Sequence, residues 1–133
     1  MRNTTSYLTL DIVLAIHEET VKRHGGSHGI RDIGLIQSAI ARPQSSFGGD
    51  DLYQTIFDKA AALFHSLMFN HAFVDGNKRT AMASTARFLF VNGYNLVVSQ
   101  KEFVAFPLKV ENQHQSIEEI SKWLKKHSTT NRL

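Results

Sequence analysis

The chain has 133 residues, of which 42% are hydrophobic and 20% charged, and this composition predicts one globular domain over residues 1–133. It has no cysteine, no apolar run of membrane-spanning length and no signal-peptide core, which excludes disulfide and thiolate sites and leads us to expect a cytosolic protein. The net charge of +3 is only mildly basic and lacks the dense basic stripe of a nucleic-acid-binding protein, so we expect no direct nucleic-acid binding.

Helical signals dominate the first third of the chain. Apolar residues recur at helical spacing and predict a helix over about residues 9–24, ended by a Gly-Gly pair. A short helix with Asp32 as its N-cap follows, and an Arg-Pro pair stops it. Residues 44–50 contain a second Gly-Gly pair and predict a loop or a small hairpin.

The strongest helical signals are two apolar stretches, at about residues 53–69 and 78–91, which are joined by the polar break from Asn70 to Asn77. The apolar stripe of the first stretch is wide enough for a central, mostly buried helix. Strand signals are few, with residues 95–99 as the candidate outside the region of Phe47. We therefore predict an all-α fold, a helical bundle with at most a small flap or hairpin.

Capping boxes of the form Ser-x-x-Glu indicate two further helices, one starting at Ser99 and one at Ser116. The earlier helix contains Pro107, which should kink or end it nearby. Residues 128–133 are expected to fray.

The break between the two central helices has the composition of a phosphate-binding site. From His71 to Arg79 it has the sequence HAFVDGNKR. A Gly-Asn turn before a helix presents unpaired backbone N–H groups, with the positive end of the helix dipole behind them. Gly76 allows the backbone to approach a ligand closely, and Asn77 adds an amide donor. Lys78 and Arg79 supply positive charge, with Arg79 suited to bidentate contact with a phosphate.

The same segment also contains an acid and a base. Asp75 is the type of oxygen ligand that Mg²⁺ uses when it shares a site with phosphates. His71 is the one side chain of the segment that can take up a proton near pH 7. Phe73 we assign to the core, as the structural anchor of the loop. Each residue alone has a commoner structural explanation, but their combination within a single short segment favours a phosphate-handling site.

The segment resembles the H-x-F-x-[D/E]-[A/G]-N-[G/K]-R loop of the Fic/Doc (Fido) superfamily. Lysine at its penultimate position is typical of the Doc branch, the death-on-curing toxins of toxin–antitoxin pairs. The stretches His24–Gln44 (HGGSHGIRDIGLIQSAIARPQ) and Phe88–Leu96 (FLFVNGYNL) are similar to Doc proteins too, so the resemblance extends over nearly the whole chain. It implies a Fic/Doc-type helical bundle with His71 between two central helices. It also implies a flap that aligns the target peptide, which we expect near residues 44–50.

The resemblance further implies a mechanism. His71 would be the general base for a target hydroxyl, and Asp75 would bind Mg²⁺. The Gly76–Asn77 turn would hold the phosphates of ATP, while Lys78 and Arg79 neutralise the charge that develops during transfer. The implied target is a threonine of elongation factor Tu, whose modification halts translation.

A separate inhibitor is also implied. Many Fic proteins restrain themselves with an [S/T]-x-x-x-E-[G/N] helix, but the one glutamate followed by Gly or Asn here is Glu111, and Pro107 stands four residues before it. Restraint is therefore expected from a Phd-like antitoxin whose disordered tail folds on the toxin. Such a partner needs an exposed apolar groove.

Three alternatives to a Doc-like kinase remain. Fic enzymes that attach AMP carry glycine in place of Lys78 and a further arginine where this chain has Met82, so both positions favour γ-phosphate transfer over an AMP-transferase. A non-catalytic binding module of the same fold is the second alternative, although every catalytic residue type is present. A helical DNA-binding protein is disfavoured because residues 116–127 offer mainly lysines.

Overall fold

The computed structural model describes residues 4–131, which form helices and two small antiparallel sheets, and this confirms the predicted all-α class. The helices are α1 (Leu10–His24), α2 (Ile33–Ala41), α3 (Ile56–Phe69), α4 (Asn77–Val91), α5 (Gln100–Gln113) and α6 (Ile117–Lys126), with a 3₁₀ turn η1 at Arg42–Gln44. The strands are β1 (Ser46–Phe47) paired with β2 (Asp50–Asp51), and β3 (Tyr94–Leu96) paired with β4 (Ser128–Thr130). Within the described residues, no helix is long and apolar enough to cross a membrane.

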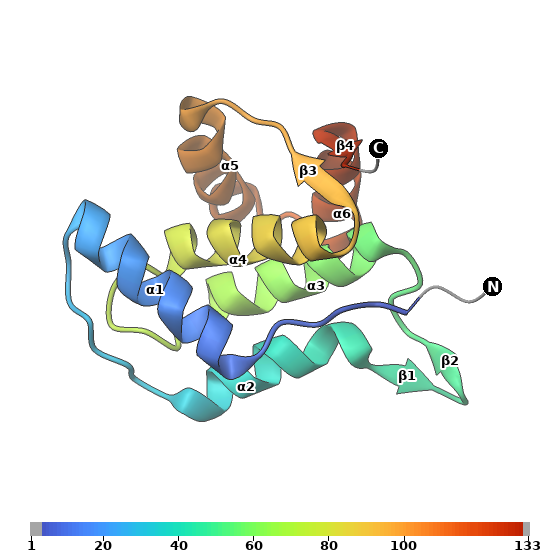
Figure 1. The fold of residues 1–133 in the computed structure, drawn as a ribbon, viewed down its shortest axis with the longest axis horizontal. Coiled ribbons are helices and arrows are strands. Elements are labelled where there is room, and N and C mark those ends of the chain that lie inside the picture. Colours follow the sequence, from blue (N-terminus) through green and yellow to red (C-terminus); the bar gives the residue numbers. More distant parts are fainter. Residues whose placement is uncertain (1–3, 132–133) are drawn as a thin grey trace.

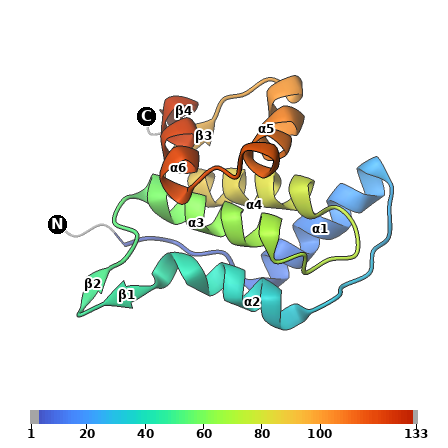
Figure 2. The same ribbon diagram turned by 180° about the vertical axis from the view of Figure 1, so that it is seen from behind.

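Helices α3 and α4 lie side by side at the centre of the molecule, with α1 and α2 packed on one side of them and α5 and α6 on the other (Figures 1 and 2). The sequence of α3 allows neighbours to approach closely, because Ala60, Ala61 and Ala62 are all fully buried. Large side chains fill the space around this small-residue stretch, among them Phe64 and Phe88, which are also buried. The loop between α3 and α4 is therefore held at both ends by the most buried helices of the fold.

Side-chain caps begin the helices where the sequence predicts them. The Asp32 carboxylate accepts a hydrogen bond from the Leu35 N–H and caps α2. Both predicted capping boxes are present, at Ser99 for α5 and at Ser116 for α6. A third capping box, at Thr55, begins α3.

Pro107 does not end its helix, and the expected fraying after residue 127 was wrong for residues 128–130. Helix α5 continues through Pro107 to Gln113, although a proline removes one helix hydrogen bond and costs about 3 kcal/mol. Packing offsets this cost, because Pro107 is buried and the preceding Phe106 stacks on Trp123 of α6 at a centroid distance of 3.6 Å. Residues 128–130 do not fray but form β4 against β3, a pairing with distant residues that leaves no local pattern; residues 132–133 lie outside the described part.

The predicted hairpin exists as β1–β2, but it does not lie where the resemblance led us to expect a flap. It projects from the end of the molecule where α3 begins, whereas the loop that carries His71 follows the other end of that helix (Figures 1 and 2). Helix α3 has 14 residues, so its two ends are about 20 Å apart. The buried amine of Lys59 anchors the hairpin by donating to the Asp51 carboxylate and the Tyr53 carbonyl.

Candidate active site

The loop from Asn70 to Gly76 reverses the chain between the two central helices. The Asn70 N–H still bonds to the Ser66 carbonyl, and the next residue, His71, has a left-handed backbone with φ of 51°. Histidine is among the few residue types that are enriched in this left-handed region. The same conformation costs more conformational energy for a β-branched residue than for histidine. The turn leaves the His71 side chain exposed, with no hydrogen bond to any residue in the range 4–131.

The connection between α1 and α2, residues 25–32, lies along this loop. The Val74 N–H donates to the Gly29 carbonyl over 3.0 Å, and an antiparallel bridge joins Ile30 to Phe73. The N–H groups of Arg31 and Asp32 both donate to the Ala72 carbonyl. It is therefore this connection, and not the β1–β2 hairpin, that borders the loop.

Asn77 closes the loop from the other side. Its Oδ1 accepts a hydrogen bond from the Phe73 N–H over 3.1 Å, and its Nδ2 donates to the Phe73 carbonyl over 2.9 Å. The side-chain amide expected to face a phosphate is thus largely used within the loop, with one Nδ2 hydrogen left over. The phosphate contact of this residue falls mainly to its backbone N–H.

Helix α4 begins without a side-chain cap. Gly76, its N-cap, is left-handed with φ of 78°, a conformation that favours glycine. The backbone N–H groups of residues 76–79 find no acceptor within the described part of the chain, and the first bond of this turn runs from the Thr80 N–H to the Gly76 carbonyl. Four neighbouring N–H groups at the positive end of a helix can bind an anion.

One cavity of about 300 Å³ brings the predicted site residues together. Its lining consists of Met68, His71, Val74, Asp75, Gly76, Asn77, Lys78 and Arg79. Phe73 lies beneath it in the core and is 1% exposed. The residues that carry the base, the acid, the free N–H groups and both cations therefore line a single space.

Asp75 is the residue that can hold a cation here. Its Oδ2 accepts from the Ser27 N–H over 2.7 Å, while its other carboxylate oxygen has no partner among residues 4–131. Within those residues no three acidic or histidine side chains form a cluster that could hold a metal alone. Mg²⁺ bound with nucleotide phosphates needs only one or two carboxylates, so the residues present fit a metal that arrives with the nucleotide.

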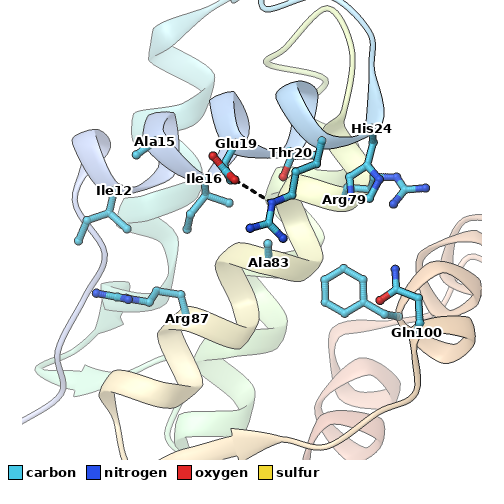
Figure 3. Close-up of a pocket in the computed structure, with 12 residues that line it drawn as sticks. Ile12, Ala15, Ile16, Glu19, Thr20, His24, Arg79, Ala83, Arg87 and Gln100 are labelled. Carbon is cyan, nitrogen blue, oxygen red and sulfur yellow. Dashed lines mark hydrogen bonds and ion pairs between the residues drawn. The ribbon is translucent and has the colours of Figure 1, made fainter.

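The two cations of the loop differ in their surroundings. Lys78 Nζ lies 3.3 Å from Glu111 Oε2 of α5, in a half-exposed ion pair of small energetic value. Arg79 has no ion pair within the described residues. It lines the site cavity and also a larger groove between α1 and α4 (Figure 3).

This α1–α4 groove has a volume of about 560 Å³. Figure 3 shows Ile12 and Ile16 of α1 facing Ala83 and Arg87 of α4 across it. Its lining is completed by Ala15, Glu19, Thr20, Arg23, His24, Arg79, Gln100 and Phe103. The groove therefore combines an apolar floor with several cations, and its one acid, Glu19, is already paired with Arg23.

Sequence reasoning missed the residues that support the loop from a distance. Ser27 and Gly29 bond to it from the α1–α2 connection, and the His17 ring of α1 contacts it from below. They precede the loop by more than forty positions, so no spacing pattern could reveal them. His65, by contrast, lies outside the site: burial, together with the charge of Arg42, lowers the pKa of its ring, as befits a packed residue.

Comparison with known proteins gives two kinds of match. The model of the Fic/DOC family matches residues 7–89. A protein named Toxin Doc from Mycolicibacterium smegmatis is 54% identical over 72 residues, which cover 54% of this chain and 55% of that protein. A protein named Protein kinase doc from Escherichia phage P1 is 30% identical over 87 residues, 65% of this chain and 68% of that protein. The chain thus spans little more than half the length of the mycobacterial relative.

The Asn77 side chain should be measurably important for stability. We expect Asn77→Asp to lower the free energy of unfolding by about 1–3 kcal/mol at neutral pH, because a carboxylate cannot donate to the Phe73 carbonyl and repels it. Urea denaturation measures this, with Asn95→Asp, an exposed change on β3, as the control. Equal stability of both variants would contradict the role of Asn77 in closing the loop.

Proposed function

The chain belongs to the Fic/DOC family, and from this premise we propose that it is a Doc-like toxin, a kinase that transfers the γ-phosphate of ATP to a hydroxyl of a protein. One observation carries the proposal: the residues that supply a base, an acid, two cations and four N–H groups without an acceptor in the described part of the chain all line one cavity. The names of the two relatives, Toxin Doc and Protein kinase doc, support the toxic and kinase parts of it.

In the proposed reaction His71 removes the proton from the target hydroxyl, and the hydroxyl oxygen attacks the γ-phosphorus. The bond from that phosphorus to the β–γ bridging oxygen breaks, so the products are a phosphorylated protein and ADP. The N–H groups of residues 76–79 would bind the phosphate oxygens, and Arg79 would neutralise charge in the transition state. Asp75 would hold Mg²⁺, which supplies further charge neutralisation when bound.

Two features favour phosphoryl transfer over AMP transfer. Lys78 lines the cavity at the position where AMP-attaching relatives of this fold carry glycine. We propose that its bulk and charge leave no room for the α- and β-phosphates as an AMP donor would place them. Met82, where those enzymes carry an arginine, is fully buried and lines no part of the cavity. An AMP-transferase or a non-catalytic binding module of the same fold are the alternatives.

For the target we propose a threonine of elongation factor Tu, so that modification halts translation. The support is the family resemblance together with the surroundings of His71. Val74 of the loop and Ile30 of the α1–α2 connection have exposed apolar side chains, at 46% and 42% exposure. They would contact the protein segment that presents the hydroxyl.

For the partner we propose a Phd-like antitoxin whose tail occupies the α1–α4 groove. An apolar floor bordered by Arg79 and Arg87 suits a segment that carries apolar and acidic side chains (Figure 3). Because Arg79 also lines the site cavity, an acidic residue in the groove would compete with a phosphate for it.

The reaction type is tested by label transfer to proteins of a bacterial lysate with Mg²⁺, comparing ATP labelled at the γ-phosphate with ATP labelled at the α-phosphate. We expect label from the γ-position alone, and a loss of at least about 100-fold in His71→Ala. His114→Ala is the matched control, because His114 is also exposed and left-handed but lies at the end of α5. Label from the α-position would make the protein an AMP-transferase, and label from neither would favour the binding module.

The role of Lys78 is tested by a pair of substitutions. Lys78→Gly should reduce γ-phosphate transfer about tenfold or more and admit some label from the α-position, because it removes both charge and bulk. Lys78→Met keeps most of the bulk and should lose rate without gaining α-label. A full γ-transfer rate in Lys78→Gly would show that this lysine does not determine how the nucleotide binds.

The location of the antitoxin is tested at the end of the groove remote from Arg79. Ile12→Glu places a negative charge beside the proposed acidic tail, and co-expression of a Phd-like antitoxin should then no longer relieve growth arrest. Val97→Glu, an exposed position after β3 that lies outside both the groove and the site cavity, is the control. Label transfer by Ile12→Glu without antitoxin verifies its fold, and undiminished relief by the antitoxin would place its tail elsewhere.

A further inference from the structure

We infer that His17 is a positioning residue of this site: its Nε2–H holds the Asp75 carbonyl so that the N–H groups at the start of α4 face the nucleotide. The inference rests on the proposed function for the identity of the ligand. It concerns a residue of α1 that precedes Asp75 by 58 positions, whereas Asp75 lies in the loop before α4.

His17 makes two contacts with the loop from beneath. Its ring stacks on Phe73, with centroids 3.7 Å apart and planes within 10°. Its Nε2 lies 2.8 Å from the Asp75 carbonyl oxygen. Because a carbonyl only accepts, the ring must carry a proton on Nε2, which defines its tautomer. The side chain is buried, with 3% exposed, so water does not compete for this bond.

The hydrogen bond fixes the peptide unit that precedes α4. In a trans peptide the C=O and the following N–H point in opposite directions. The Asp75 carbonyl points inward to His17, and the Gly76 N–H, which has no acceptor within the described residues, therefore points away from the interior. The orientation of this peptide unit therefore fixes the direction of the Gly76 N–H, the first of the four unbonded N–H groups of residues 76–79.

The packing of α1 under the turn also supports this role in positioning the start of α4. A Cβ on Gly76 would lie 3.5 Å from Val21 and 3.6 Å from His17, which is ordinary contact, so α1 forms a floor directly under the turn. The side chain of Asp75 is held as well, because its carboxylate accepts a hydrogen bond from the Ser27 N–H. Asp75 is thus fixed by its backbone from one side of the fold and by its side chain from another.

If His17 were only a core residue, its ring stack on Phe73 would be sufficient and its hydrogen bond to Asp75 would not matter. Two substitutions separate the effect of the stack from that of the hydrogen bond. His17→Phe keeps a flat ring against Phe73 but has no donor. His17→Gln keeps an N–H donor at a similar reach but loses the ring. His65→Phe is the matched control, because His65 also packs against a phenylalanine, Phe69, at 4.8 Å, and lies outside the cavity.

The readouts are the affinity for AMP-PNP with Mg²⁺ by calorimetry and the midpoint of urea unfolding. We expect His17→Phe to bind about tenfold more weakly with a folded structure. His17→Gln should bind within about threefold of the parent chain although it is the less stable variant, and His65→Phe should bind normally. Normal affinity in His17→Phe, or affinity that simply follows stability across the series, overturns the inference.

A second readout needs no nucleotide, so it separates this inference from the proposed function. In ¹⁵N spectra of the free protein we expect the His17 proton on Nε2, and we expect the Gly76 and Asn77 amide resonances to move in His17→Phe but not in His65→Phe. A proton on Nδ1 alone, or unmoved amides, overturns the inference. If the parent chain binds no nucleotide while these amides move, the proposed function fails and the positioning role stands.

Discussion

The site depends on the burial of one aromatic ring. Phe73 is 1% exposed and stacks on His17, while its backbone N–H and C=O are both bonded to the Asn77 side chain. The carbonyl of its neighbour Ala72 accepts two hydrogen bonds from N–H groups of the α1–α2 connection. A loop of polar, exposed residues would otherwise be mobile, because it lacks apolar surface to bury. With this ring and the neighbouring Ala72 in the core, the exposed residues His71 and Asp75 are held in place by the buried part of the loop.

Local interactions explain what could be predicted from sequence. The caps at Asp32, Ser99 and Ser116 join residues three apart, and the phosphate-binding composition lies in one short segment. What could not be predicted depends on distant partners. The strand at 128–130 exists because it pairs with residues 94–96, and α5 passes Pro107 because its neighbour stacks on α6. Neither partner can be found from spacing along the chain.

The position of the flap was the most consequential of these errors. The Gly-Gly pair at 48–49 indicated a hairpin correctly, but composition does not say which end of α3 a hairpin occupies. The α1–α2 connection, with its own Gly-Gly pair at 25–26, borders the loop instead. The candidate site residues on the loop could thus be predicted as a group. The backbone that supports them belongs to the α1–α2 connection, whose glycine pair had indicated only the end of a helix.

The packing of α6 against α3 has a consequence for the order of events in a cell. Helix α3 leads into the loop, whereas its partner α6 (Ile117–Lys126) comes well after the loop in the sequence. A nascent chain therefore carries every residue of the loop well before it can assemble the support for that loop. The loop is therefore expected to reach its folded geometry only after α6 has emerged from the ribosome.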